Sequence, residues 1–425
     1  MILKRFWKLI ALCLVIIMIL VTYFIHTSLV VANQFPDLVL KTIDGDESVM
    51  TDVVVTGDYH DTRQNDSSSV MVSLKDSIYH KEQSFFEKLE TQFPMINTVS
   101  KLKDEYRNFL RSKSMHPDYF FENNEFVAYV DVETPDNIIR GDSEFYFNVD
   151  VLTKKTEKSN DFTIKIPGQS EMDYTQVIDV QMVNGELKVL TESSFFGSNG
   201  RHINELMVYT IDLSKQKISG DDTLSVKGDL TSDTWTSFIF LNDRSDVSEQ
   251  KYFLLQREEN SKPEEVSKQE GLNEVEEAEI KVIKRSFYLY DLENKGLREI
   301  PLNEEQAKGL LKSDTWGFVS GENAYIAYNS EDSLTVLDID LEHLKVESTA
   351  RFNIEDLGID TIGDVKISDN TIYVIDNYKD NVDPTNVFAG DVTSGEVLYE
   401  GEIVMEKPED ESEDYQINFY GIVMK

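Results

Sequence analysis

The tetrapeptide Ser-Asp-Thr-Trp occurs twice, beginning at Ser232 and again at Ser313, and it contains the residues best suited to hold a ligand. A tryptophan beside a carboxylate can bind sugars or cationic groups. Looser echoes of the motif begin at Asp173 and Asp360. The candidate binding residues are Asp173, Asp233, Trp235, Asp314, Trp316 and Asp360. A structural role is the alternative, with each tryptophan wedged between neighbouring units. Repetition of identical residues favours that role, because a ligand seldom needs the same contact twice.

Sequence signatures of catalysis are missing from the chain. The segment around Ser170 reads Gly-Gln-Ser-Glu-Met and lacks the second glycine of a nucleophile elbow. The six histidines form no His-x-x-x-His pair, and no Cys-x-x-Cys occurs, so a zinc site has no support. No glycine-rich phosphate loop is present. We therefore predict no catalytic residue and no zinc ligand.

Two carboxylate-rich segments make calcium the metal to consider. The segment from Asp376 to Asp383 holds five Asp and Asn side chains, and the segment from Asp44 to Ser48 is similar. Neither has the alternating acids, central glycine and terminal glutamate of a calcium loop. We expect no cofactor, and Ca²⁺ stays open as the alternative.

The composition excludes whole classes of function. The chain has 425 residues, of which 40% are hydrophobic, and a formal net charge of −38. Residues 1–36 contain three basic and no acidic side chains, so the remainder carries −41. Such a polyanion repels phosphate backbones, and we exclude nucleic acid as a partner. The single cysteine, Cys13, leaves the rest of the chain without disulfides.

The first 32 residues predict a cytoplasmic tip and a transmembrane signal-anchor. The run from Leu9 to Ile25 is almost purely apolar, and three basic residues precede it. Seventeen helical residues span about 25 Å, near the lower limit for a bilayer. The preceding basic residues place the N-terminus in the cytoplasm and the following domain outside it. A cleaved leader is the alternative, because Ala32 would suit a signal peptidase.

Short alternating strands dominate the chain from Tyr119 onward, and they repeat. An aspartate followed by an aliphatic residue recurs at Asp150, Asp212, Asp291, Asp340 and Asp391. The spacing of these markers and of the Ser-Asp-Thr-Trp echoes lengthens and shortens together, which indicates one repeated supersecondary unit. The third unit is longer, and we attribute this to an exposed acidic loop over residues 257–281. No further helix is expected beyond Tyr119.

The repeat predicts an all-β fold. Four-stranded antiparallel units every 46–62 residues are typical of propeller blades, so the chain resembles the β-propeller superfold, with six blades expected and five or seven as alternatives. We expect residues 33–50 to be a linker and residues 51–425 to form the propeller. Residues 82–112 predict a helical insertion. The final strand, Tyr415 to Met424, should close the ring by joining N-terminal strands near residues 52–56 and 70–74.

These features favour a membrane-tethered, extracytoplasmic β-propeller that acts as a non-catalytic binding or sensing module. Its partner would be an envelope protein, a peptide or a wall polymer, and its membrane contact would run through Leu9 to Ile25. One alternative is a hydrolase with an acidic active site at the propeller channel. Another is an accessory subunit of a membrane complex.

Overall fold

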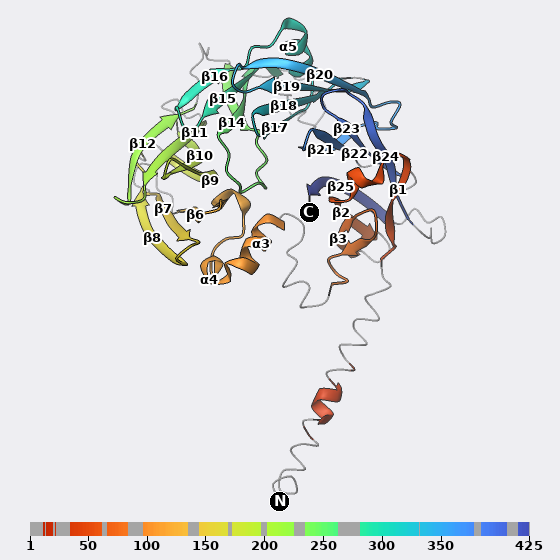
Figure 1. Ribbon diagram of the computed structural model, residues 1–425, viewed down its shortest axis with the longest axis horizontal. Coiled ribbons are helices and arrows are strands. Elements are labelled where there is room, and N and C mark those ends of the chain that lie inside the picture. Colours follow the sequence, from red (N-terminus) through yellow and green to blue (C-terminus); the bar gives the residue numbers. More distant parts are fainter. Residues whose placement is uncertain are drawn as a thin grey trace, which may run out of the picture.

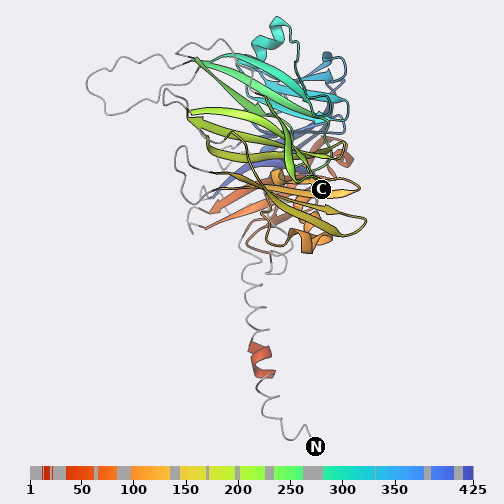
Figure 2. The same cartoon turned by 90° about the vertical axis from the view of Figure 1, so that its left-hand side faces the viewer.

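The strands form six antiparallel sheets arranged in a ring, as in a six-bladed β-propeller (Figure 1). The computed structural model describes residues 12, 14–19, 22, 35–61, 66–83, 97–134, 144–168, 172–196, 202–224, 234–261, 281–330, 332–377, 384–405 and 415–424. The expected count of six blades is therefore confirmed in the described part of the chain. Figure 2 shows the same ring from its edge.

Each sheet is one blade, and the strands of each blade are named in order from the centre of the ring outward. Blade 1 contains β25 (Tyr415–Met424), β2 (Val53–Asp61), β3 (Asp66–Val72) and β4 (Ser77–Tyr79). Blade 2 contains β5 (Phe120–Glu122), β6 (Phe126–Glu133), β7 (Tyr146–Thr153) and β8 (Lys158–Lys165). Blade 3 contains β9 (Met172–Val183), β10 (Glu186–Phe196), β11 (His202–Asp212) and β12 (Lys217–Thr223).

The remaining blades follow the same order. Blade 4 contains β13 (Thr234–Phe240), β14 (Tyr252–Ser261), β15 (Lys281–Asp291) and β16 (Gly296–Glu299). Blade 5 contains β17 (Thr315–Ser320), β18 (Asn323–Asn329), β19 (Ser333–Asp340) and β20 (Lys345–Asn353). Blade 6 contains β21 (Ile362–Ser368), β22 (Thr371–Asp376), β23 (Thr385–Asp391), β24 (Val397–Met405) and β1 (Leu38–Gly45).

Both ends of the described domain are bound into sheets. The last strand, β25, pairs with β2 from Val53↔Met424 to Asp61↔Tyr415, so the expected closure of the ring is confirmed. The expected linker over residues 33–50 was wrong for much of its length. β1 pairs with β24 and adds a fifth strand to blade 6, and a 3-10 helix, η1 (Glu47–Met50), follows it. Leu38 and Leu40 are buried there, which explains why this segment joins the sheet.

The repeated aspartates fix the turn between the third and fourth strands of four blades. In blade 3, Asp212 Oδ1 accepts hydrogen bonds from the backbone N–H groups of residues 214 and 215. Asp291, Asp340 and Asp391 make the same pair of bonds in blades 4, 5 and 6. The carboxylate thereby satisfies two backbone donors that the sheet leaves free. Asp150 in blade 2 differs, because it forms an ion pair with Lys113.

Five apolar clusters join neighbouring blades, one each at the boundaries 2–3, 3–4, 4–5, 5–6 and 6–1. Successive side chains of a strand serve opposite boundaries, since Phe253 and Leu255 face blade 3 whereas Leu254 faces blade 5. The sixth described cluster does not join blades 1 and 2. It packs α3 (Asn97–Glu105) and α4 (Arg107–Leu110) against blade 2 and Val247.

Several short helical segments interrupt the strands. α3 and α4 lie within the expected insertion over residues 82–112, of which residues 84–96 fall outside the described part of the chain. A short 3-10 helix, η2 (Pro117–Tyr119), leads into β5. The expectation of no helix after Tyr119 was wrong, because α5 (Glu304–Leu311) connects blades 4 and 5. Asn303 and Gln306 form its capping box.

Two further expected segments are described only in part. Arg257 to Ser261 belong to β14 and pair with β15, so the acidic loop begins later than expected, and residues 262–280 lie outside the described part of the chain. The segment from Leu9 to Ile25 also lies largely outside it. No helix among the described residues is long and apolar enough to span a bilayer.

Candidate functional site

The candidate binding residues that the structure describes lie at equivalent positions on one side of the ring. Connections from strand 2 to strand 3, and from one blade to the next, lie on the side that we name the loop face. Connections from strand 1 to 2 and from strand 3 to 4 lie on the opposite turn face. Asp173 and Trp235 are near the starts of β9 and β13, and Trp316 near that of β17. Asp314 and Asp360 precede β17 and β21 by one and two residues, whereas Asp233 lies outside the described residues.

The second Ser-Asp-Thr-Trp copy ties blade 5 to blade 4. Thr315 Oγ1 donates a hydrogen bond of 2.5 Å to Gln256 Oε1 on β14. The Ser313 carbonyl oxygen accepts a hydrogen bond of 2.5 Å from Arg285 Nη1. Trp316 packs against the apolar cluster between blades 5 and 6. These contacts favour the structural interpretation for this copy.

The first copy is in a different environment. Trp235 is partly buried and opposite Asn260 in the β13–β14 register. It packs against none of the described apolar clusters, in contrast to Trp316. Of the two motif tryptophans, Trp235 therefore makes the fewer packing contacts with the described apolar clusters, and its ring is the better placed to contact a ligand.

A cavity of about 450 Å³ opens on the loop face between blades 5 and 6. Its lining includes Lys308, Lys312, Asn329, Ile354, Asp360 and Ile362. Both lysines are exposed and stand four residues apart on and just after α5. Neither forms an ion pair with a carboxylate of the described residues. The cavity thus combines two cations, one carboxylate and two isoleucines at the end of the innermost strand β21.

The turn face of the ring centre is crossed by the connection from β13 to β14, residues 241–251, which we name the central loop (Figure 1). Asp243 forms an ion pair with Lys366 of blade 6, and Arg244 with Asp118 of η2. The Val247 carbonyl accepts a hydrogen bond from Glu122 N at 2.7 Å. A further bond of 2.9 Å joins the Gln250 backbone N–H to the Gln181 side chain of β9. The central loop therefore links blades 2, 3, 4 and 6.

One buried and one partly buried carboxyl group, those of Asp179 and Asp364, lie beside the central loop. Burial raises the pKa of Asp179 to about 8, the nearby Asp246 adds to the rise, and a hydrogen bond from Gln181 opposes it. Burial likewise raises the pKa of Asp364 to about 6, against a 2.8 Å hydrogen bond from Ile422 N. Asp179 is therefore mainly protonated at neutral pH, which removes the cost of burying a charge.

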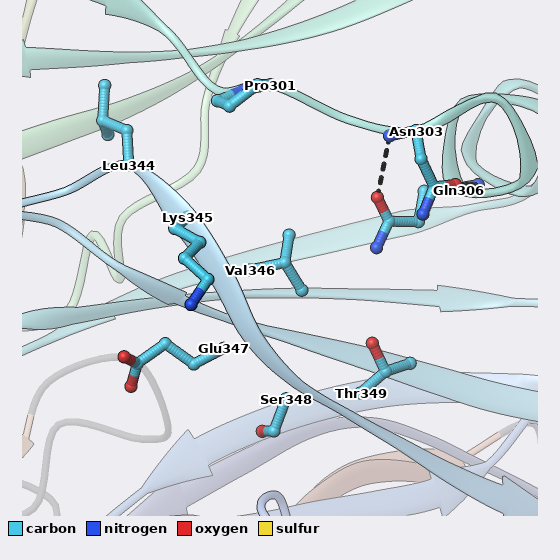
Figure 3. A pocket seen from close by; sticks show the side chains of 9 residues that line it. All are labelled: Pro301, Asn303, Gln306, Leu344, Lys345, Val346, Glu347, Ser348 and Thr349. Carbon is cyan, nitrogen blue, oxygen red and sulfur yellow. Dashed lines mark hydrogen bonds between the residues drawn. The ribbon is translucent and has the colours of Figure 1, made fainter.

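A second groove lies on the outside of the ring, where β20 approaches the start of α5 (Figure 3). Its volume is about 420 Å³, and Asn303, Gln306, Lys345, Glu347 and Thr349 are among its lining residues. The capping box occupies Asn303 and Gln306, whose hydrogen bond is drawn in Figure 3. None of the candidate binding residues lines this groove, so the loop-face cavity is the better candidate.

The carboxylate-rich segments considered for calcium have other contacts where they are described. Asp46 accepts a hydrogen bond of 2.8 Å from Ser48 N at the start of η1, and Glu47 accepts one from Thr42. Asp376 ends β22, whereas residues 378–383 lie outside the described part of the chain. Among the described residues, no group of three or more His, Cys, Asp or Glu side chains could hold a metal ion.

Comparisons with known proteins show similarity of fold. No protein-family model matches the chain, and no curated protein matches it. The solved structure of the Dos1 propeller is similar with a TM-score of 0.31 and 12% identity over 64% of this chain and 57% of that one. Dipeptidyl peptidase 4 of Porphyromonas gingivalis gives a TM-score of 0.29 and 8% identity over 65% of this chain and 46% of that one. A prolyl endopeptidase gives a TM-score of 0.29 and 9% identity over 85% of this chain and 50% of that one. The chain thus spans about half the length of each of these three structures.

Proposed function

We propose that this chain is a membrane-tethered, extracytoplasmic binding or sensing module whose ligand occupies the loop-face cavity between blades 5 and 6. The observation that carries the proposal is this cavity beside Asp360, at the end of the ring where the candidate residues begin the innermost strands. The central loop crosses the opposite end and is held there by four blades. A ligand entering the ring centre would therefore approach from the loop face.

The cavity suits a ligand that carries both an anionic and a cationic group, such as a peptide. Lys308 and Lys312 would pair with a carboxylate of the ligand, and Asp360 would face its amine. The side chains of Ile354 and Ile362 supply apolar surface between these charges. A peptide is one of the partners that the sequence predicts.

Two observations support the proposal of a membrane tether: the apolar N-terminal run, and the exposure of those residues of the run that the structure describes. Residues 14–19 are helical, and their side chains are between 48% and 66% exposed. Six consecutive exposed apolar side chains are unfavourable in water but suited to lipid. The preceding basic residues orient the tether with its N-terminus in the cytoplasm.

The proposal is tested by peptide binding to the full chain in detergent, measured by calorimetry with a library of short zwitterionic peptides. Charge reversal at Lys308 and Lys312 should weaken the binding of any hit at least ten-fold. Reversal of Lys345 and Lys284, two exposed lysines outside the cavity, serves as the matched control. Equal loss in both double variants, or no peptide binding at all, would contradict the proposed cavity.

One contact favours the hydrolase as a second candidate. His116 Nδ1 lies 3.3 Å from Asp118 Oδ2, and burial, aided by Arg244, lowers the pKa of the imidazole. His116 Nδ1 nevertheless forms no hydrogen bond, so the contact is one of proximity. A neutral histidine can act as a general base. The Arg244 contact gives Asp118 a structural role as well. Hydrolysis of envelope peptides or glycans that is lost in His116→Ala, with the fold retained by circular dichroism, would favour this candidate.

A further inference from the structure

The helical insertion carries a basic surface on a strongly acidic chain. Residues 97–116 contain five Lys and Arg side chains against two acidic ones, whereas the whole chain has a net charge of −38. Lys101, Arg107 and Arg111 are exposed, and none of them forms an ion pair with a described carboxylate. We name these three side chains the basic face. Lys113, by contrast, pairs with Asp150 and holds the insertion on blade 2.

The insertion is fixed on the ring, so the basic face has a defined position. Val99, Leu102, Phe109 and Leu110 are buried against blade 2. Lys154 forms an ion pair with Glu122 and lies 5.2 Å from the centre of the Tyr106 ring. These contacts use the apolar sides of α3 and α4, and the three basic side chains remain exposed. The two helices lie between blades 1 and 2 (Figure 1).

The chain from the tether reaches the propeller at blade 1, the neighbour of blade 2 on which the insertion packs. Phe35, the first described residue after the apolar run, stacks on Tyr79 at the end of β4 with ring centres 4.7 Å apart. The Tyr79 hydroxyl donates a hydrogen bond of 2.7 Å to the Pro36 carbonyl. The connection that contains α3 and α4 leaves blade 1 from the end of β4, at this same Tyr79. The tether and the insertion therefore attach to the same strand.

We propose that the basic face docks on the anionic lipid headgroups of the membrane in which the N-terminal segment is anchored. This inference rests on the proposed tether. An acidic domain held next to an anionic surface is repelled by it, so the domain should turn its basic face toward the lipid. Docking in this orientation fixes the propeller relative to the plane of the membrane.

The expected strength follows from the charges. Each Lys or Arg at an anionic membrane surface strengthens association about five-fold, so three give about a hundred-fold. Three such contacts alone give a dissociation constant of about 6 mM, and the tether supplies a local concentration of the same millimolar order, so roughly half of the molecules should be docked. Screening over about 8 Å at physiological salt limits the repulsion from acidic blades farther away. Docking should therefore be lost at high salt.

The experiment uses the full chain in nanodiscs of phosphatidylcholine, with or without phosphatidylglycerol, and measures amide hydrogen exchange over residues 97–113. We expect about two-fold slower exchange at the exposed positions in the anionic nanodiscs, and none of this protection at about 0.5 M NaCl. Co-elution of the chain with nanodiscs tests the tether separately. Co-elution without lipid-dependent protection would overturn the docking proposal and leave the tether standing.

A matched charge reversal sharpens the result. Lys101→Glu, Arg107→Glu and Arg111→Glu together should abolish the protection while the exchange of the blade cores stays unchanged. The control variant reverses Lys217, Lys284 and Lys345, which are exposed on blades 3, 4 and 5. It changes the net charge equally but should keep the protection. Loss of protection in both triple variants would show that total charge alone acts, and protection kept in both would show that the three side chains make no contact with the lipid. Either outcome would refute the basic face.

Discussion

Replacing Asp179 by asparagine should stabilise the protein and remove much of its dependence on pH. Asp179 is 4% exposed, and burial raises its pKa from 3.8 to about 8. Between these values the folded state binds a proton that the unfolded state has lost. The stability that this group contributes is therefore complete below about pH 4 and falls as the pH rises to about 8. At pH 7 the difference is roughly three pKa units, or about 4 kcal/mol as an upper limit.

Asparagine is uncharged at every pH and has nearly the shape of the protonated aspartic acid. Its side-chain oxygen can keep the 2.9 Å hydrogen bond from Gln181 Nε2. Chemical denaturation from pH 4 to pH 8 should show that the stability advantage of Asp179→Asn grows with pH. Asp52→Asn is the matched control, because this substitution also replaces a carboxylate by an amide but does so at an exposed position. Parallel stability curves for the wild type and Asp179→Asn would refute the reasoning.

The other predictions concern packing. Trp316→Ala should cost about 2 kcal/mol by opening space at the boundary of blades 5 and 6, whereas Trp235→Ala should cost clearly less. Thermal unfolding of both variants compares them, and equal destabilisation would remove the distinction between the two motif copies. Gly390→Ala should cost about 1–3 kcal/mol, because the new Cβ would stand 2.2 Å from the Phe352 ring. If this variant melted at the wild-type temperature, the Phe352 ring would be able to move aside without loss of stability, and the prediction would be wrong.

The ring of blades could be predicted from the sequence because the same kinds of turn residues recur from blade to blade. The Asn184-Gly185 pair adopts positive φ at both positions and makes the tight turn between β9 and β10 that its composition predicts. In blades 3 to 6 the repeated aspartates accept hydrogen bonds from backbone donors two and three residues later, so their spacing marks the end of the third strand in these four blades. The closing strand β25 was also predictable, since its alternating residues had no other sheet to join.

Features that depend on distant residues could not be predicted from the sequence. The central loop has the composition of an ordinary polar turn, and its ion pair with Lys366 joins residues 123 positions apart. Asp179 lies among apolar strand residues, where alternation alone does not tell burial from exposure. α5 had a local signal, since Asn303 and Gln306 have the spacing of a capping box, but the eight-residue helix is too short for a clear apolar period.

The architecture gives a physical reason for placing ligand recognition at a blade boundary on the loop face. Apolar side chains fill the described boundaries along the strands, so space for a ligand between neighbouring blades opens beyond the ends of the sheets. Turn-face connections bridge strands of one blade, and the one at Asn184-Gly185 is only two residues long, although the central loop has eleven residues. Connections from one blade to the next also lie on the loop face, and the one from β16 to β17 carries α5 and the two lysines of the cavity. The cavity beside Asp360 follows from this asymmetry, because α5 and the connection from β20 to β21 surround it from two neighbouring boundaries.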